Sequence, residues 1–245
     1  MNSNVGATHK EKNIYLWLTK FTNRNKKPEK TFCGTESRSL RTPSTDTTKH
    51  IATMNHPIRF TTPEEAVKVI KSGDHVHLSS VASVPQILVR AMTARGEAGE
   101  LQHVHIHHLH TEGEALYAVP EMEGIFQLDS FFVGGNVRNI TQQGFADYIP
   151  VFLSETQRLY RDGILPCNVA MIQVSTPDRH GYVSLGTSVD ATLAAVECAD
   201  TVIAVVNRHV PRSFGDSSIH TSQIDLFVED DTPLIEEHFA EPNDL

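Results

Sequence analysis

Five histidines and two glutamates lie between Leu101 and Glu114, in the stretch LQHVHIHHLHTEGE. In an extended strand alternate side chains share a face, which would place His103, His105 and His107 together. Neutral imidazoles that converge in this way can bind Zn²⁺ or another transition metal. One hypothesis for this chain is therefore a metal-dependent hydrolase built on His105 and His107.

Such a metal site needs further ligands from elsewhere in the chain. His180, His209 and His220 are candidates, but nothing in their spacing distinguishes one from another. The sequence contains no HExxH motif and no Cys/His spacing of the zinc type. The alternative, which we favour, is an ordinary strand whose histidines are hydrogen-bonded beneath helices. We therefore expect no bound metal.

His110, Thr111 and Glu112 directly follow this predicted strand. Catalytic groups tend to lie at that point in parallel sheets, and a carboxylate there could act as a nucleophile or a general base. A polar loop, in which Thr111 or Glu112 caps the short segment 114–117, explains the same residues without catalysis.

The stretch FVGGNVRN places two glycines and an asparagine after a predicted strand. Glycine leaves backbone N–H groups free to form an anion-binding nest, and a nearby arginine could hold a carboxylate or a phosphate. A plain tight turn is the alternative, since the stretch matches neither GxGxxG nor a Walker loop. The residues concerned are Gly134, Gly135, Asn136 and Arg138.

Two further loops follow predicted strands. STPDRHGYVSLG, residues 175–186, brings an Asp, an Arg and His180 to the expected active edge, and Gly181 suits a positive φ; a hairpin-like loop is the plain alternative. NRHVPRSFGDSSIH, residues 207–220, carries Arg208 and Arg212. These two arginines could steer an acidic ligand, or they could be solvated loop residues.

Helical and strand signals alternate along the chain from Met54 onward. Helices are predicted after the capping box at Thr62, from Pro85 to Gly96, from Ser154 to Gly163, and over 188–199. Strands are predicted at 75–78, 104–107, 131–133, 168–174 and 201–206. We expect an α/β fold with an open, mainly parallel sheet, helices on both faces, and a site at the carboxyl ends of the strands.

Charge and composition separate residues 1–53 from the rest. This segment holds ten Lys/Arg and four Asp/Glu, whereas residues 54–245 hold 11 and 26. We expect 1–53 to be a disordered or misassigned extension, with a mitochondrial presequence or a functional arm as alternatives. The acidic remainder, 54–245, is expected to form one domain and disfavours nucleic acid as a partner.

The expected compartment is reducing and cytoplasmic, or mitochondrial if residues 1–53 are a presequence. The three cysteines, Cys33, Cys167 and Cys198, form no CxxC pair. No apolar run approaches the roughly 18 residues that a membrane span needs. We therefore expect no association with a membrane.

Six stretches, in unchanged order, resemble the acetyl-CoA hydrolase/transferase family, especially its 4-hydroxybutyrate and butyrate:acetate CoA-transferase branch. They extend over about residues 57–240, and PDxHGYxSLG is the most specific motif among them. The stretches are SGDHVHLSSVASVPQILVRAM, HLHTEGEALY, FVGGNVR, ADYIPVFLSE, ILPCNVAMIQVSTPDRHGYVSLG and VIAVVNRHVPRSFGDSSIH.

The resemblance implies a subunit of two α/β halves with the active site between them. A glutamate attacks the thioester of an acyl-CoA, forms a mixed anhydride and becomes a glutamyl-CoA thioester, while backbone amides stabilise the oxyanions. In the family this glutamate and the Gly-rich CoA-contacting loops belong to the second half. The resemblance therefore places the nucleophile beyond Leu245, and we expect neither Glu112 nor any other residue of this chain to be catalytic.

The resemblance also implies a function for this half. We expect the amino-terminal domain of a CoA-transferase of short-chain carboxylic acids, such as 4-hydroxybutyrate or butyrate with acetate, inactive by itself. Coenzyme A would be a substrate and no cofactor would be covalently bound. The carboxy-terminal half and further copies in a homo-oligomer would be its partners. An acetyl-CoA hydrolase and a non-catalytic half-subunit are alternatives. The expected substrate-binding residues are Gly134, Gly135, Asn136, Arg138, His180 and Gly181.

Overall fold

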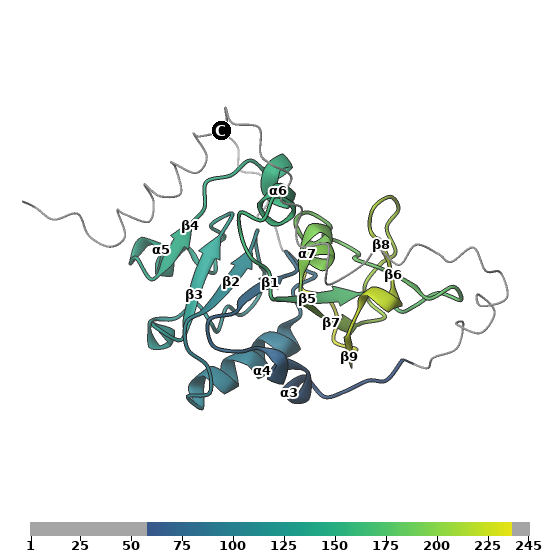
Figure 1. Cartoon of the computed structure of the whole chain (residues 1–245), viewed down its shortest axis with the longest axis horizontal. Coiled ribbons are helices and arrows are strands. Elements are labelled where there is room, and N and C mark those ends of the chain that lie inside the picture. The colour runs from purple at the N-terminus through teal and green to yellow at the C-terminus, as the bar shows by residue number, and fades with distance from the viewer. Residues whose placement is uncertain (1–57, 237–245) are drawn as a thin grey trace, which may run out of the picture.

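The computed structural model describes residues 58–236. In this range seven strands form one sheet in the order β4-β3-β2-β1-β5-β7-β9 (Figure 1). Every neighbouring pair in the sheet is parallel. The expected α/β fold with a mainly parallel sheet is therefore confirmed. The predicted extension at 1–53 lies outside the described residues.

The strands and helices are short, and most of them alternate along the chain. The strands are β1 (His75–Leu78), β2 (Val104–His108), β3 (Phe126–Ser130), β4 (Ala146–Tyr148), β5 (Val169–Val174), β6 (Tyr182–Ser184), β7 (Thr201–Val206), β8 (Ser218–His220) and β9 (Leu226–Glu229). The α-helices are α3 (Pro63–Ala66), α4 (Gln86–Glu97), α5 (Arg138–Gln142), α6 (Thr156–Arg161) and α7 (Thr192–Cys198). Four 3₁₀ turns are η1 (Val67–Val69), η2 (Pro120–Met122), η3 (Leu153–Glu155) and η4 (Thr221–Gln223). None of the helices within 58–236 is long and apolar enough to cross a membrane.

Helices cover both faces of the sheet. Figure 1 shows α3 and α4 on one side and α6 and α7 on the other. Strand residues such as Val76, Ile106 and Leu128 are buried in the layer with α3 and α4. Ile172 and Ala204 are buried in the layer with α6 and α7. Burial on both sides explains why β5 and β7 are continuous apolar runs.

Local signals in the sequence explain how α3 and α4 begin and pack. The Thr62 hydroxyl accepts a hydrogen bond from the backbone N–H of Glu65 at 3.2 Å, as the capping box predicted, and Pro63 occupies the first helical position. α4 ends at Glu97, one residue after the predicted exit at Gly96. A Cβ at Gly96 would lie 2.6 Å from the Phe126 ring, so glycine lets α4 approach β3 closely.

The predicted strand at 131–133 is wrong. The strand is β3, which ends at Ser130, and Phe131 to Val133 belong to the following loop. In β3, Phe126 and Leu128 are buried in the layer with α3 and α4, whereas Gln127 and Asp129 are only partly buried. This alternation of apolar and polar side chains is typical of a strand. In the run Phe-Phe-Val, by contrast, Phe131 is buried, Phe132 is exposed and Val133 is partly buried.

Two predicted helix starts also differ from the structure. The box at Ser154 to Gln157 does not cap a helix: a 3₁₀ turn covers Leu153–Glu155 and α6 begins at Thr156. The helix expected from Ser188 begins at Thr192 instead. There the Asp190 carboxylate accepts hydrogen bonds from the Thr192 N–H at 3.2 Å and from its hydroxyl at 3.3 Å.

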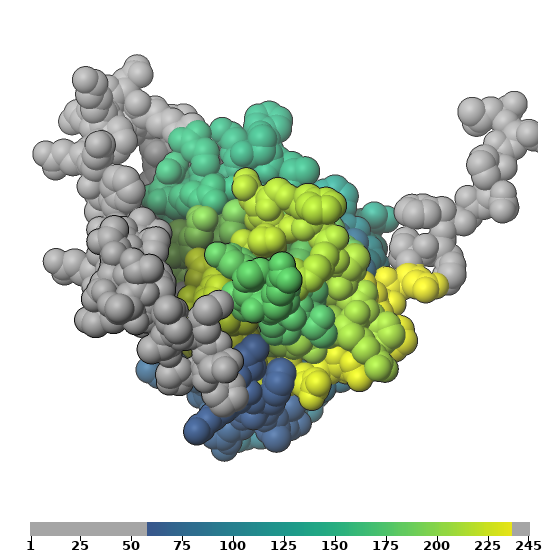
Figure 2. All heavy atoms as spheres, turned by 90° about the vertical axis from the view of Figure 1, so that its right-hand side faces the viewer, coloured from purple at the N-terminus to yellow at the C-terminus, as the bar shows by residue number. Residues whose placement is uncertain are grey.

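A second, two-stranded sheet lies beside the large one. β6 pairs antiparallel with β8, so Tyr182 faces His220 although the two residues are far apart in sequence. Figure 2 shows the segment around β6 in green, flanked by the yellow-green and yellow segments that follow residue 206. The 175–186 stretch is hairpin-like, as the plain alternative predicted: the N–H of Ser175 donates to the carbonyl of Ser184 at 2.9 Å, and the N–H of Asp178 donates to that of Tyr182 at 2.9 Å. β6 also takes a partner strand from the 207–220 stretch.

Candidate functional site

The loops after β1 and β2 are joined at the carboxyl edge of the sheet. The backbone N–H of Val81 donates to the carbonyl of His110 at 2.6 Å, and Val81 forms an isolated parallel bridge with Thr111. Val81 has a φ of 53°, a left-handed conformation that is strained for a β-branched residue. Strain of this kind persists only where the surrounding structure imposes it, which is common at binding sites.

The side chains of His110 and Glu112 contact each other on the loop after β2. Nε2 of His110 lies 2.9 Å from Oε1 of Glu112, and both side chains are partly exposed. The Phe132 ring lies against His110, with 5.4 Å between ring centroids. The carbonyl of Glu112 accepts a hydrogen bond from Nε2 of Gln86 at 3.0 Å. The pair therefore sits on a loop that α4 holds in place, with one side open to solvent.

The loop after β3 packs directly on this pair of side chains. Nδ2 of Asn136 donates to Oγ1 of Thr111 at 3.2 Å and to the carbonyl of Gly113 at 3.3 Å. A Cβ at Gly134 would lie 2.6 Å from the imidazole of His110. Gly134 is therefore required for close approach, and the structure brings Gly134 and Asn136 together with His110.

Gly135 and Arg138 are exposed next to this contact. Space is open around Gly135, where an added Cβ would meet no atom within 4 Å. Arg138 is the first residue of α5. Both residues are accessible to a ligand at the carboxyl edge, although they make none of the contacts that join the loops.

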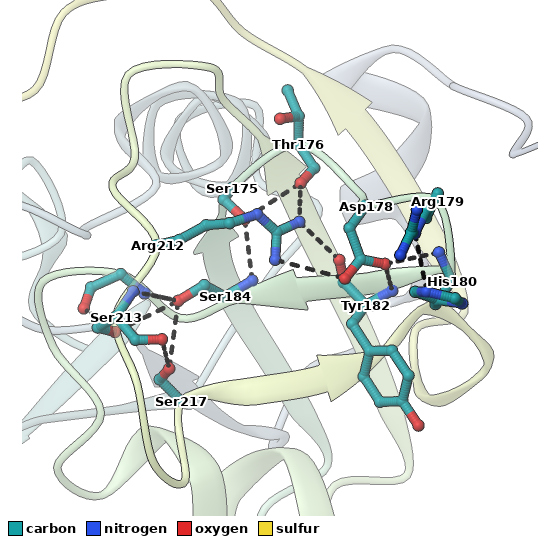
Figure 3. Close-up of polar contacts among 11 residues, drawn as sticks. Ser175, Thr176, Asp178, Arg179, His180, Tyr182, Ser184, Arg212, Ser213 and Ser217 are labelled. Carbon is teal, nitrogen blue, oxygen red and sulfur yellow. Dashed lines mark hydrogen bonds and ion pairs between the residues drawn. The ribbon is translucent and has the colours of Figure 1, made fainter.

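His180 and Gly181 lie in a separate turn at the start of β6 (Figure 3). Oδ1 of Asp178 accepts hydrogen bonds from the N–H of His180 at 2.8 Å and of Tyr182 at 2.9 Å. These backbone hydrogen bonds, that of Tyr182 first, lower the pKa of Asp178. Gly181 has a φ of 81°, as the sequence predicted.

Arg212 connects this turn to the 207–220 segment. Its Nη2 donates to the carbonyls of Thr176 at 2.7 Å and Tyr182 at 2.9 Å, and its Nη1 lies 3.9 Å from Asp178 (Figure 3). The guanidinium is thus occupied by backbone carbonyls. This arrangement favours a structural role for Arg212 over the steering of an acidic ligand.

The two groups of expected substrate-binding residues do not touch each other in the described part of the chain. The loop after β1 lies between them: Val81 contacts the β2 loop, while Oγ of Ser83 lies 2.6 Å from Oγ1 of Thr187, beyond β6. An open groove of about 540 Å³ borders the same edge. It is lined by Leu109, Leu153, Ser154, Gln157, Thr187, Ser188, Val189 and Asp190.

A second polar group lies on the face of the sheet that carries α6 and α7. Register pairs His75 of β1 with His105 of β2, and His107 of β2 with Asp129 of β3. Hydrogen-bonding or ligating atoms of all four side chains lie within 4.8 Å of one another. His103, expected on this face, does not join them, because it precedes β2 with a φ of 55°.

Short contacts connect the four side chains. Nδ1 of His105 lies 2.8 Å and Nε2 of His107 lies 3.4 Å from Oδ2 of Asp129, and Nδ1 of His75 lies 3.0 Å from Nε2 of His107. Burial and then the imidazoles of His107 and His105 lower the pKa of His75 to about 4. Burial alone would raise the pKa of Asp129, but hydrogen bonds from His105 and His107 lower it to about 2.

Two further buried histidines, His77 and His108, differ in their hydrogen bonding. Nδ1 of His77 lies 3.0 Å from the Tyr160 hydroxyl and its Nε2 lies 3.1 Å from the Thr192 hydroxyl, beneath α6 and α7. Both ring nitrogens of His108 are buried with no partner among residues 58–236. Hydrogen bonding beneath helices therefore explains His77 but not His108.

A family model for the amino-terminal domain of acetyl-CoA hydrolases/transferases matches residues 45–236. The chain belongs to the acetyl-CoA hydrolase/transferase family. A 4-hydroxybutyrate coenzyme A transferase of Clostridium kluyveri is 39% identical over 178 residues, covering 73% of this chain and 41% of that protein. A succinyl-CoA:acetate/propanoyl-CoA:succinate CoA transferase of Fasciola hepatica is 38% identical over 161 residues, covering 66% of this chain and 33% of that one.

Two solved structures share the fold of this chain. RipA of Yersinia pestis aligns with a TM-score of 0.70 at 29% identity, over 76% of this chain and 45% of its own. A 4-hydroxybutyrate CoA-transferase of Porphyromonas gingivalis aligns with a TM-score of 0.61 at 32% identity, over 73% and 41%. The chain thus spans less than half the length of these relatives, and the predicted resemblance is confirmed.

Proposed function

We propose that this chain is the amino-terminal domain of a CoA-transferase that moves CoA between an acyl-CoA and a short-chain carboxylate. Coenzyme A is a substrate in this proposal, and no cofactor is covalently bound. Family membership and the similarity to named CoA-transferases support the class of reaction. For the carboxylic acid substrate we propose 4-hydroxybutyrate, butyrate and acetate as the first acids to test.

The joining of the β2 and β3 loops carries this proposal. It places the exposed Gly135 and Arg138 next to the His110–Glu112 pair, at the edge where parallel sheets bind ligands. Arg138 supplies a positive charge for an acidic substrate, and the glycine backbone leaves room for a ligand to approach N–H groups. We propose Gly134, Gly135, Asn136 and Arg138 as one wall of the carboxylate pocket.

His180 and Gly181 belong to a second part of the proposed pocket. They lie in the turn held by Asp178, and His180 is exposed there. Because the two groups do not touch within this domain, a substrate of CoA size would have to extend across the loop after β1 to reach both. The long CoA molecule suits such a separation better than a small acid does.

The nucleophile of the proposed reaction comes from the carboxy-terminal half. Its carboxylate attacks the thioester carbon, CoA leaves as the thiolate, and a mixed anhydride remains. The CoA thiolate then attacks the glutamyl carbonyl of the anhydride, which releases the first acid and leaves a glutamyl-CoA thioester. The acceptor carboxylate repeats these steps in reverse. Glu112, paired with His110, has no covalent role.

A hybrid enzyme tests the proposal. Residues 58–236 of this chain would replace the matching region of the C. kluyveri transferase, and mass spectrometry would follow acetyl-CoA plus 4-hydroxybutyrate or butyrate. We expect acyl exchange and a glutamyl-CoA adduct in the hybrid, and neither in this chain alone. Release of free CoA without an acceptor acid would identify the hydrolase alternative. An adduct on the isolated chain would contradict the proposal, as would a folded hybrid that transfers no CoA beside an active parent.

A further inference from the structure

Four side chains from three neighbouring strands meet on the α6/α7 face of the sheet. They are His75, His105, His107 and Asp129, and each offers one ligand atom to the same small volume. No hydrophobic residue of β1 or β2 shares this face, because Val76, Leu78, Val104 and Ile106 all point into the layer with α3 and α4. On this face of the sheet, β1 and β2 therefore carry polar side chains, whereas β5 and β7 carry apolar ones.

The contacts within this histidine–aspartate cluster have the dimensions of a metal site. The three measured separations are 2.8 Å, 3.0 Å and 3.4 Å, and the longest between any two ligand atoms is at most 4.8 Å. Ligand atoms about 2.0–2.1 Å from a tetrahedral Zn²⁺ lie about 3.3–3.4 Å from one another. Small movements of the half-buried rings of His75 and His105 would bring the atoms to that spacing.

Burial differs across the cluster in a way that suits capture of an ion. The His107 side chain is fully buried and that of Asp129 is 14% exposed, whereas the His105 side chain is 35% exposed. Nδ1 of His107 has no partner among the described residues, so every polar contact of this ring is made by Nε2, toward the cluster. The two most buried ligands, His107 and Asp129, are thus already in position. An ion can enter the cluster from the exposed side, at His105.

The types of ligand atom in the cluster favour one class of metal ion. Three imidazole nitrogens and one carboxylate oxygen suit Zn²⁺ and its first-row neighbours, whereas Ca²⁺ and Mg²⁺ prefer oxygen ligands.

We propose that His75, His105, His107 and Asp129 bind one divalent first-row transition metal ion, Zn²⁺ above all, that connects β1, β2 and β3. With four protein ligands the site is closed, so its role is to stabilise the sheet by linking three of its strands. This proposal does not depend on the proposed transferase function, since it concerns binding and stability alone.

Metal titration of the full chain, without a polyhistidine tag, tests this site. After treatment with EDTA and its removal, we expect one Zn²⁺ or Co²⁺ per chain in calorimetry, a higher melting temperature with metal, and a Co²⁺ absorption spectrum of tetrahedral type. Outer-shell changes already weaken metal binding by about 10–100-fold. His105→Asn and Asp129→Asn should therefore weaken it about 100-fold or more.

His103→Asn is the matched control, because it removes a nearby histidine outside the cluster, and asparagine tolerates the positive φ at that position. This variant should bind metal as the wild type does. Folded wild-type protein without stoichiometric binding would overturn the proposal, as would an octahedral Co²⁺ spectrum or unchanged affinity in folded ligand variants. If the ligand variants do not fold, the wild-type titration and the Co²⁺ spectrum still test the proposal.

Discussion

His107 and Asp129 face each other across β2 and β3, with Nε2 of the histidine 3.4 Å from Oδ2 of the aspartate. The same oxygen lies 2.8 Å from Nδ1 of His105. One carboxylate on β3 therefore holds two imidazoles of β2. The residues that first suggested metal chemistry are positioned by a side chain from a strand that begins 18 residues after β2 ends.

Asp129→Asn should destabilise the metal-free protein. The change weakens two charge-assisted contacts in a largely buried place, and hydrogen bonds to charged groups contribute about 1.5–3 kcal/mol each. We expect the free energy of unfolding to fall by about 2 kcal/mol in urea titrations that contain EDTA. Asp162→Asn, at an exposed carboxylate at the end of α6, is the control and should change stability by less than about 0.5 kcal/mol. A neutral result for Asp129→Asn would mean that the carboxylate does not hold the imidazoles in solution.

Gly134→Ala should disturb the contact between the β2 and β3 loops. The new Cβ would lie 2.6 Å from the His110 ring, and forcing extra atoms into a packed place costs about 1–3 kcal/mol. Gly135→Ala, where space is open, should be neutral within about 0.5 kcal/mol. Thermal unfolding of both variants measures the difference, and equal melting temperatures would show that the two loops are not packed as described.

Arg212→Lys should loosen the link between the 175–186 and 207–220 segments. Lysine cannot reproduce the planar fork that donates to the carbonyls of Thr176 and Tyr182. We expect a loss of about 1–2 kcal/mol in unfolding free energy and faster amide exchange in β6. Arg208→Lys affects only an exposed ion pair with Asp231, so it serves as the control. It should change the unfolding free energy and the amide exchange very little. Matching exchange rates in the two variants would count against the proposed link.

Ionisation of the Tyr117 phenol should lower the stability of the folded protein at alkaline pH. Burial raises the pKa of Tyr117 above its ordinary value of 10, so the folded state keeps the phenol proton after the unfolded chain has lost it. Its contribution is therefore complete below pH 10 and is lost as pH rises further, by up to about 1.4 kcal/mol per pH unit. Tyr117→Phe removes this group, so unfolding free energies measured between about pH 9 and about pH 11 should fall less steeply in the variant. Parallel curves for both proteins would contradict the burial of the phenol.

The strands and helix starts that local patterns encode were predictable. Apolar runs such as β5 and β7 and the capping box at Thr62 depend on neighbours in sequence, so composition and spacing are sufficient for them. β3 was misplaced because Phe131 to Val133 look more strand-like than Phe126 to Ser130. The alternation of apolar and polar residues over 126–130 is itself a strand signal, but the apolar run next to it is more conspicuous.

The sequence by itself determined the parallel α/β class, the family, and which loops follow the strands at the carboxyl edge of the sheet. Tertiary structure alone decided which of these loops meet: Gly134 contacts His110, whereas His180 lies elsewhere, on a small sheet whose second strand follows β7. It also joined His75 and Asp129 to His105 and His107, in place of His180, His209 or His220. The physical reason is register, since pairing between parallel strands is set by packing across the whole sheet, and a shift of one residue would turn these side chains to the opposite face.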